Sequence, residues 1–189
     1  IKEIGSTMCT LFDHEQDGSK VATIVVRGST TNIMDDVERL KSRAGIAACD
    51  FIKDGMKLGL GTGSTVHYTV IEIGRRISDE GLNVVGVPTS EATRELAEKV
   101  GIPLITLAES GGLDLIIDGA DEFDDNFSLI KGGGGALTRE KIVAQSSKSM
   151  VVVADDRKQV SVLGAFDLPV EVLPFEWERT RDRISTICP

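Results

Sequence analysis

The segment at residues 118–140, DGADEFDDNFSLIKGGGGALTRE, combines the residue types that proton transfer at a carbon atom requires. Asp118, Asp121 and Glu140 supply carboxylates, which can take up and return protons. Lys131 supplies a cation that could neutralise developing negative charge. It is followed by four glycines, whose backbone can approach a ligand closely and adopt positive φ. An acid, a base and a cation around an open loop predict an enolisation site.

A second glycine-rich stretch occupies residues 57–77, KLGLGTGSTVHYTVIEIGRRI. Its first four residues predict a short buried strand, and the apolar spacing that follows the turn predicts a helix. The strand would turn through Gly61, Thr62 and Gly63 into this helix, with Ser64 or Thr65 as the N-cap. Free backbone N–H groups and the helix dipole would then make an anion-binding site at the turn.

Two nucleotide-binding motifs fit this turn less well. A P-loop needs a lysine before its serine or threonine, where this chain has Gly63. A dinucleotide-binding fingerprint needs a third glycine, where this chain has Ser64. The turn therefore favours a compact phosphate carried by a small molecule over a nucleotide.

Several separate motifs, in one order, resemble the ribose 5-phosphate isomerase A family over about residues 41–177. They are GLGTGST (59–65), GVPTS (86–90), DGADE (118–122), KGGGGALTREKI (131–142), VVADDRKQV (152–160) and LPVEVLPF (168–175). The resemblance implies an aldose–ketose isomerase of the pentose phosphate pathway. Such an enzyme interconverts ribose 5-phosphate and ribulose 5-phosphate through an enediolate, without a metal or a cofactor.

The resemblance also implies roles for the catalytic residues. It assigns Glu140 as the base that moves a proton between C1 and C2 of the sugar. It assigns Asp118, with Asp121 beside it, to ring opening and to proton movement on the sugar oxygens. Lys131 matches the cation that stabilises the enediolate.

A second set of residues is implied to bind the substrate, mainly its phosphate. A dianionic phosphate needs N–H donors, hydroxyls and cationic side chains. The expected set is Lys41, Gly63, Ser64, Thr65, Gly132, Gly133 and Lys158. The expected partner is therefore a small-molecule sugar phosphate.

Each of these residues also has a purely structural interpretation. Asp118 could end a buried strand and bond to a turn, and Glu140 could be a first-turn acid that favours the helix dipole. Lys41 and Lys158 could be ordinary surface lysines. The acidic run at 121–125 is typical of a solvated turn, and only its first residue, Asp121, is expected to be functional. The run lacks the pattern of a calcium loop, so no metal site is predicted.

Residues 1–40 contain nothing that completes an isomerase. They predict two strands, at 9–12 and 22–27, joined by a hairpin turn at Asp17-Gly18, and a helix that begins at 35–40. The pattern ATIVVRGSTTNIMDDVER resembles part of a group II cytosolic chaperonin subunit but contains no ATP-binding motif. The chain therefore looks like a fusion of a chaperonin-like fragment with an isomerase.

The remaining pattern predicts an α/β fold with a parallel, Rossmann-like sheet flanked by helices. Short segments rich in valine and isoleucine predict strands at 84–87, 104–107, 113–117 and 150–153, and helices are expected at 90–100 and 138–146. The central strands are apolar on both sides, as buried parallel strands should be.

Three parts are expected along the chain. Residues 1–40 would form an N-terminal β-hairpin extension, and residues 41–163 would form the isomerase domain. Residues 164–189 would form a small α+β lobe that is incomplete relative to the family, with a strand at 170–173 and a helix at 178–187.

Composition narrows the classes of function. A formal net charge of −9 argues against general nucleic-acid binding, and no apolar run is long enough to span a membrane. Three scattered cysteines predict free thiols and a cytoplasmic location. The family resemblance implies a homo-oligomer, either a dimer or a tetramer. A non-catalytic sugar-phosphate binding module and a chaperonin-related interaction protein remain alternatives to the isomerase.

Overall fold

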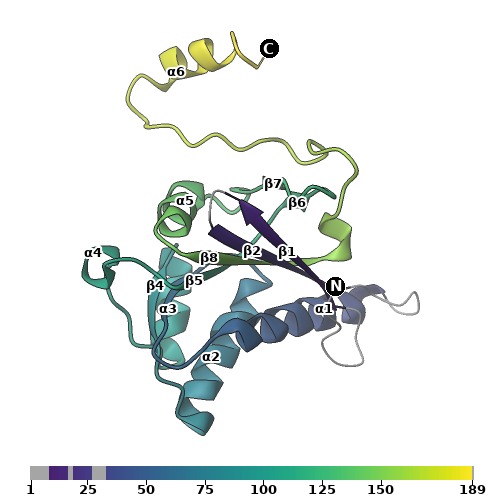
Figure 1. The fold of residues 1–189 in the computed structure, drawn as a ribbon. Helices are drawn as coiled ribbons and strands as arrows, with labels where there is room; N and C mark the ends of the chain where they lie inside the picture. The colour runs from purple at the N-terminus through teal and green to yellow at the C-terminus, as the bar shows by residue number, and fades with distance from the viewer. Residues whose placement is uncertain (1–8, 17–18, 27–32, 189) are drawn as a thin grey trace.

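A sheet of six strands forms the centre of the molecule (Figure 1). The computed structural model describes residues 9–16, 19–26 and 33–188, with side chains described for 22–26 and 37–188. In spatial order the strands are β1 (Cys9–Gln16), β2 (Ser19–Val26), β8 (Ser149–Asp155), β5 (Leu115–Gly119), β3 (Lys57–Leu60) and β4 (Val85–Pro88). Strands β2, β8, β5, β3 and β4 run parallel, and β1 pairs antiparallel with β2.

Helices cover both faces of this sheet. The helices on one face are α1 (Ile33–Ala48), α2 (Val66–Glu80) and α3 (Glu91–Lys99) (Figure 1). The other face carries α5 (Leu137–Gln145) and the hairpin of β6 (Glu122–Phe123) and β7 (Leu129–Ile130). The shorter elements are α4 (Leu107–Ser110), η1 (Cys49–Phe51), η2 (Asp156–Lys158) and the C-terminal helix α6 (Trp177–Ile184). The predicted α/β fold with a parallel, helix-flanked sheet is confirmed.

Strand side chains alternate between two cores, because successive residues of a strand point to opposite faces of the sheet. Ile117 of β5 packs into the core that α1 and α2 cover. Its neighbour Ile116 packs against Val143 of α5 on the other face, where Val25 of β2 also packs against Phe123 of the hairpin. Both faces of the central strands are therefore buried, which explains their continuous apolar sequence.

The N-terminal hairpin belongs to the same sheet. Strand β2 pairs in parallel with β8 and extends the sheet beyond it. Ile24, Val25 and Val26 are almost completely buried there. The predicted hairpin is confirmed by the pairing of β1 with β2, and its expected turn at Asp17-Gly18 lies outside the described residues. Helix α1 then runs without a break through residue 40 and supplies side chains to the cavity described below.

The strand expected at 104–107 is wrong. Leu104 makes an isolated parallel bridge with Gly86, and the chain then enters α4. The Thr106 hydroxyl accepts the N–H of Glu109, whose carboxylate accepts the N–H of Thr106 in return. This capping box is a local helix-start signal, and it outweighs the apolar pattern that suggested a strand.

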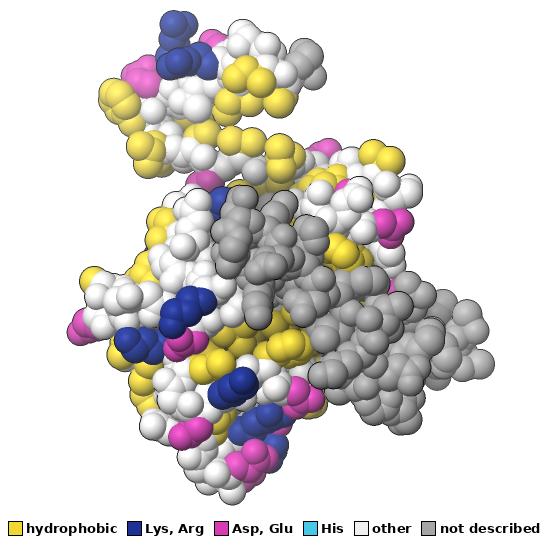
Figure 2. Space-filling view, viewed as in Figure 1, with side chains coloured by type: hydrophobic (Ala, Val, Ile, Leu, Met, Phe, Trp, Pro, Cys, Tyr) yellow, Lys and Arg dark blue, Asp and Glu magenta, His cyan; other side chains and the backbone are white. Residues whose placement is uncertain are grey.

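The segment after η2 differs in part from the expected small lobe. The expected helix forms as α6, but residues 170–173 form no strand. A strand needs a neighbour for its backbone hydrogen bonds, and no described strand pairs with this segment. Figure 1 shows it running away from the sheet, and Figure 2 shows apolar side chains along it. Leu173 and Phe175 are 82% and 84% exposed.

Candidate active site

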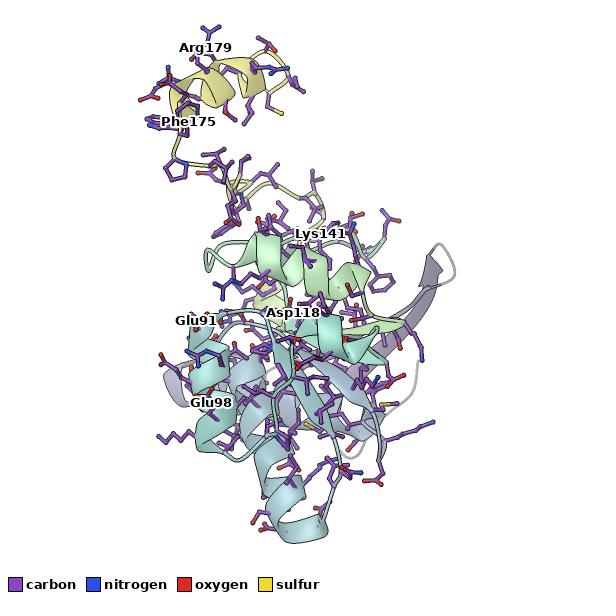
Figure 3. All side chains as sticks on the ribbon, turned by 90° about the vertical axis from the view of Figure 1, so that its left-hand side faces the viewer. Glu91, Glu98, Asp118, Lys141, Phe175 and Arg179 are labelled. Carbon is purple, nitrogen blue, oxygen red and sulfur yellow. The ribbon has the colours of Figure 1, made fainter. Side chains whose placement is uncertain are left out.

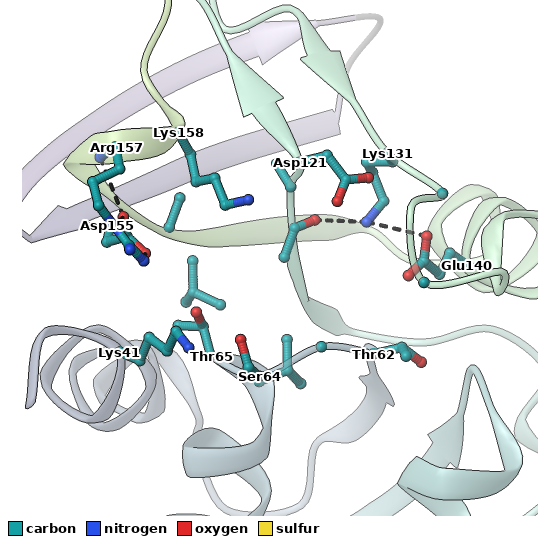
Figure 4. A pocket seen from close by; sticks show the side chains of 18 residues that line it. Lys41, Thr62, Ser64, Thr65, Asp121, Lys131, Glu140, Asp155, Arg157 and Lys158 are labelled. Carbon is teal, nitrogen blue, oxygen red and sulfur yellow. Dashed lines mark hydrogen bonds and ion pairs between the residues drawn. The ribbon is translucent and has the colours of Figure 1, made fainter. Parts of the chain in front are cut away.

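A cavity of about 230 Å³ opens at the carboxyl ends of β3, β5 and β8 (Figure 4). After β3 the chain moves to β4 on one side, whereas after β5 it moves to β8 on the other side. Such a switch in strand order separates the two following loops and is where ligands bind in open α/β sheets. The fold therefore brings motifs that are distant in the sequence to one place.

The loop after β3 lies against the end of β5. A Cβ atom at Gly61 would collide with the Asp118 carboxylate, so only glycine fits there. Gly63 has a φ of +133°, which also favours glycine. Thr65 is the N-cap of α2, within the predicted pair, but its side chain makes no capping hydrogen bond. No described residue bonds the Ser64 hydroxyl either, so both hydroxyls can serve a ligand.

Asp118 is completely buried, with 0% exposure. Its Oδ1 accepts the backbone N–H groups of Thr62 at 3.1 Å and of Gly119 at 2.8 Å. Its Oδ2 lies 2.9 Å from the ammonium of Lys131. One oxygen therefore ties the loop after β3 to the end of β5, and the other faces the lysine. Figure 3 shows this residue in the interior, whereas Glu91 and Glu98 lie on the outside of α3.

Lys131 bridges two buried carboxylates. Its Nζ lies 2.9 Å from Asp118 Oδ2 and 3.3 Å from Glu140 Oε2, and it donates to the carbonyl of Gly119 at 2.6 Å (Figure 4). Apart from this ion pairing, the two carboxylate oxygens accept no hydrogen bond from any described residue. Buried carboxylate oxygens normally accept hydrogen bonds, and here the ammonium of Lys131 is their one described partner.

Glu140 lies in the first turn of α5 and is 5% exposed. Burial raises the pKa of its carboxyl, and the negative charge of Asp118 raises it further, while Lys131 opposes both. The net shift of the pKa is upward because desolvation disfavours the charged form. A carboxyl with a raised pKa holds a transferred proton more readily, which suits a group that must take up a proton and return it.

Asp121 holds the glycine loop that follows Lys131. Its Oδ2 accepts the N–H of Gly133 at 2.7 Å. A Cβ atom at Gly133 would come within 2.7 Å of both the Asp121 carboxylate and the Phe166 ring. Gly132 has a φ of +103°, in agreement with the conformational freedom expected of the glycine run. The contact gives Asp121 a part in shaping the rim of the cavity.

Basic side chains line the other end of the cavity (Figure 4). Lys41 comes from α1, and Arg157 and Lys158 come from η2. Lys41 also forms an ion pair with Glu38, at 2.7 Å. Together with the hydroxyls at the start of α2, these cations make this end of the cavity suited to an anion such as phosphate.

The residues expected from the sequence meet in this cavity. Those that line it are Lys41, Gly63, Ser64, Thr65, Asp121, Lys131, Gly132, Glu140 and Lys158. Asp118 and Gly133 lie directly behind, in contact with Lys131 and Asp121. Sequence reasoning missed Thr62, Asp155 and Arg157, which also line the cavity. The position of Arg157 beside Lys158 in the ADDRKQV motif was a signal that could have identified it.

The interpretation of residues 121–125 as a solvated turn is wrong at Glu122. This side chain is 4% exposed, and its carboxylate accepts the backbone N–H groups of Gly164, at 2.8 Å, and of Phe166. A buried carboxylate needs such donors. The result is that Glu122 fixes the chain after η2 beside the glycine loop.

Within the described residues, neither a metal-ligand cluster nor the buried cysteine provides a second reactive site. Among them, no group of three histidine, cysteine, aspartate or glutamate side chains is placed to hold a metal ion. Cys49 and Cys188 are free, and burial raises the pKa of the Cys49 thiol to about 12, which keeps this thiol protonated and unreactive at neutral pH. None of the described helices has both the length and the apolar composition needed to cross a membrane.

Comparison with known proteins identifies the relatives of this chain. The family model for ribose 5-phosphate isomerase A (phosphoriboisomerase A) matches residues 85–188, which is more than half of the chain. The chain belongs to the ribose 5-phosphate isomerase A family. The ribose-5-phosphate isomerase A of Cereibacter sphaeroides (strain ATCC 17025) is 58% identical over 145 residues, which cover 77% of this chain and 58% of that relative. The chain thus spans little more than half the length of this curated relative.

Solved structures of ribose 5-phosphate isomerases share the fold. The enzyme from Methanocaldococcus jannaschii is 42% identical with a TM-score of 0.75, and the match covers 79% of this chain and 67% of that one. A D-ribose-5-phosphate isomerase solved in complex with phospho-erythronic acid is 39% identical with a TM-score of 0.76. That match covers 79% of this chain and 66% of the other.

Proposed function

We propose that this chain interconverts ribose 5-phosphate and ribulose 5-phosphate through an enediolate. The observation that carries the proposal is the buried cluster of Asp118, Lys131 and Glu140 at one end of a cavity whose other end is basic. A phosphate at the basic end would direct the sugar chain toward the carboxylates. Membership of the family supports the same reaction. A 39% identical relative was solved with phospho-erythronic acid, a phosphorylated sugar acid of similar size.

In the proposed reaction Glu140 acts as the base on the open-chain aldose. Its carboxylate takes the proton from C2, and the electron pair of that bond forms the C1–C2 double bond while the C1 carbonyl oxygen gains negative charge. Glu140 then returns the proton to C1. The hydroxyl on O2 loses its proton and O1 gains one, so the ketose has the same atoms as the aldose. Neither an oxidant nor a reductant is needed.

Asp118 and Lys131 are the proposed partners in this step. The Oδ2 atom of Asp118, which is ion-paired with Lys131 at 2.9 Å, would accept a hydroxyl proton of the sugar, both in ring opening and in the exchange between O1 and O2. Lys131 would offset the negative charge of the enediolate. This stabilisation is stronger in a buried cluster than at the surface, because the local dielectric is lower.

The phosphate is proposed to bind at the start of α2. Backbone N–H groups at a helix N-terminus favour an anion, and the hydroxyls there make no other described bond. The proposed phosphate- and substrate-binding residues are Gly63, Ser64, Thr65, Lys41 and Lys158, with Gly132 and Gly133 along the sugar. The role of Asp121 in this proposal is to hold the glycine loop in place.

The decisive experiment measures conversion of ribose 5-phosphate to ribulose 5-phosphate by the purified chain and by Glu140→Gln. We expect turnover in the unaltered chain and a loss of about 10³-fold in kcat in the variant, because an amide cannot accept the proton. Glu95→Gln is the matched control, because Glu95 is exposed on α3.

Two results would contradict the proposal in different ways. Equal turnover in Glu140→Gln and in the unaltered chain would show that another group is the base. Binding of ribose 5-phosphate by a folded, unaltered chain that shows no turnover would favour a non-catalytic sugar-phosphate binding module instead.

Other expectations from the sequence stay predictions. These are the homo-oligomeric state, the cytoplasmic location and the division into parts at 1–40, 41–163 and 164–189. The comparisons give no support to a chaperonin-like origin of residues 1–40, which stays a hypothesis. A direct measurement of molar mass in solution would test the oligomeric state.

A further inference from the structure

Arg157 lines the basic end of the cavity but has no role in the reaction proposed above. It precedes Lys158 in η2, the short turn that follows β8. Figure 4 shows Arg157 and Lys158 on one wall of the cavity and Lys41 on the wall formed by α1. The arginine is therefore a third cation at the end where the phosphate is proposed to bind.

A buried carboxylate holds this arginine in place. Asp155 is 2% exposed, and both of its oxygens face Arg157. The Nε atom donates to Oδ1 at 2.7 Å and Nη2 donates to Oδ2 at 2.9 Å, while the backbone N–H of Arg157 also reaches Oδ1 at 3.2 Å. Two parallel bonds from one guanidinium to one carboxylate fix the plane of the guanidinium.

Electrostatics show that this pair stays charged. Burial alone would raise the pKa of Asp155, but the hydrogen bonds and the charge of Arg157 outweigh burial, and the net pKa is lowered. The arginine is thus held in one orientation before any ligand arrives. A preorganised donor loses less conformational freedom on binding than a mobile surface side chain does.

One edge of the guanidinium remains available. Arginine has five N–H donors, of which the Asp155 carboxylate takes those on one edge. No described residue accepts a hydrogen bond from Nη1, and the side chain is 52% exposed. The guanidinium therefore combines an edge fixed by Asp155 with an edge that has no described partner, on a residue that lines the cavity.

We propose that Arg157 binds the substrate phosphate together with Lys41 and Lys158, and that Asp155 is the residue that positions it. This inference rests on the proposed function, because it concerns the phosphate end of the same cavity. A planar guanidinium can give two parallel N–H bonds to two phosphate oxygens, which an ammonium cannot do. Arg157 would thereby favour a phosphorylated sugar over the same sugar without phosphate.

The test compares Arg157→Lys with the unaltered chain, because lysine keeps the charge but lacks the planar fork. Calorimetry gives Kd for inorganic phosphate and for ribose 5-phosphate, and kinetics give KM and kcat for the isomerisation. We expect both ligands to bind about fivefold more weakly, KM to rise by the same factor and kcat to stay within about twofold.

A matched control exists on α2. Arg75 donates from Nε at 2.8 Å and from Nη2 at 2.7 Å to the two oxygens of Glu72, which repeats the geometry of the pair at the cavity. It lies outside the cavity. Arg75→Lys should therefore leave phosphate affinity and KM unchanged.

The positioning role of Asp155 has its own test. Asp155→Asn should weaken phosphate binding by about threefold, because the guanidinium loses its fixed plane. The double variant Asp155→Asn/Arg157→Lys should bind phosphate no more weakly than Arg157→Lys alone, since the two residues act as one unit. Where Asp155→Asn does not fold, the result for Arg157→Lys decides the proposal.

The outcomes separate this inference from the proposed function. Weaker phosphate binding in Arg157→Lys supports the inference even in a chain without turnover, a result that would overturn only the catalytic proposal. Unchanged phosphate affinity, or a fall in kcat with Kd unchanged, overturns the inference and leaves the isomerase standing. An unaltered chain that binds neither ligand overturns both.

Discussion

The cavity has a reaction end, with Asp118, Lys131 and Glu140, and a phosphate end, where Lys41 pairs with Glu38 and Arg157 pairs with Asp155. Both ends pair acids with cations, but they differ in exposure to water. At the reaction end Asp118 and Glu140 are 0% and 5% exposed, and the Lys131 side chain is 15% exposed. At the phosphate end the side chains of Glu38 and Arg157 are 60% and 52% exposed, although their partners Lys41 and Asp155 are only 17% and 2% exposed. The charges at the reaction end are therefore almost wholly shielded from water, whereas each ion pair at the phosphate end has one partner that water reaches.

Burial decides what a charge does at each end. In the interior a charge interacts strongly and is costly when unpaired, so the reaction end behaves as one interdependent cluster. At the phosphate end water and salt screen the exposed charges, so a single exposed side chain changes ligand affinity by a small factor. Substitutions at the reaction end should change stability and turnover together, whereas those of the exposed side chains at the phosphate end should change affinity alone.

Lys131→Met should have the largest effect on stability. Loss of the ammonium leaves Asp118 and Glu140 as unpaired buried acids, which should lower the free energy of unfolding by about 3 kcal/mol. The kcat should fall by about 100-fold, with a smaller change in KM, because the cation acts on the enediolate. Urea denaturation and steady-state kinetics measure the two effects.

An exposed ion pair supplies the control for this variant. Lys148 lies 2.8 Å from Asp114, but its side chain is 78% exposed. Lys148→Met should change the free energy of unfolding by less than about 1 kcal/mol and leave kcat unchanged. A loss of kcat in Lys131→Met without any loss of stability would show that the reaction end is not an interdependent cluster.

Ser64→Ala should have a smaller effect, and only on affinity. The hydroxyl is proposed to bind the phosphate equally in the ground state and the transition state, so KM should rise about fivefold while kcat is nearly unchanged. The melting temperature should stay the same, because the hydroxyl makes no described bond in the protein. Ser78→Ala, at an exposed position on α2, the helix that follows Ser64, is the control. A fall in kcat at constant KM would contradict the assignment to phosphate.

Glu140→Gln should stabilise the fold at neutral pH while it removes turnover. The folded state raises the pKa of this carboxyl, so the ionised form is disfavoured relative to the unfolded chain. The fold favours protonated Glu140, and this contribution to stability is fully present below the pKa that the carboxyl has in the unfolded chain. It is lost as pH rises through the higher pKa that the carboxyl has in the folded state. At about pH 7.5 the variant should gain about 1 kcal/mol, or roughly 2–4 °C in the melting temperature.

The same variant should show no gain near pH 4, because the unaltered Glu140 is then largely protonated. Thermal unfolding of both proteins across this pH range measures the difference. A variant that is less stable than the unaltered chain at about pH 7.5 would mean that Lys131 compensates the buried carboxylate fully. The reaction end would then hold no excess negative charge.

Some of this site could be predicted from the sequence. Asp118, Lys131 and Glu140 stand close together in the chain beside a glycine run, and their residue types indicate proton transfer. Their burial could not be predicted in the same way. It depends on α5 packing over the sheet through contacts such as Val143 with Ile116, which join distant parts of the chain.

Prediction of the fold from the sequence meets the same limit, because contacts between distant parts of the chain leave no local signal. Apolar segments predicted the parallel strands, but no local pattern indicates that β2 pairs with β8, far along the chain. Glu122 has the sequence context of a solvated turn, yet it is buried and accepts the backbone N–H groups of Gly164 and Phe166, about forty residues further along the chain. The capping box at Thr106 is a different case. Its signal, a threonine followed three residues later by a glutamate, is present in the sequence, but the strand was predicted from the apolar pattern instead.

Glu38→Gln should have the smallest effect and should strengthen phosphate binding. Hydrogen bonds from Lys41 and from the Tyr68 hydroxyl, each at 2.7 Å, hold the pKa of Glu38 below its usual range, so this carboxyl is ionised at neutral pH. Its charge opposes the phosphate and competes with it for Lys41. Without that charge, the Kd of inorganic phosphate should fall about twofold at low salt.

Salt makes this last variant a sharp test of the contrast between the two ends. The gain in phosphate affinity of Glu38→Gln should shrink at high salt, because exposed charges are screened. The loss of kcat in Lys131→Met should persist, because buried charges are screened much less. Titrations at low and high salt measure the first, and kinetics at saturating substrate measure the second. Weaker phosphate binding in Glu38→Gln would mean that Glu38 orients Lys41 toward the ligand. The phosphate end would then be preorganised by its acids, as Asp155 is proposed to do for Arg157.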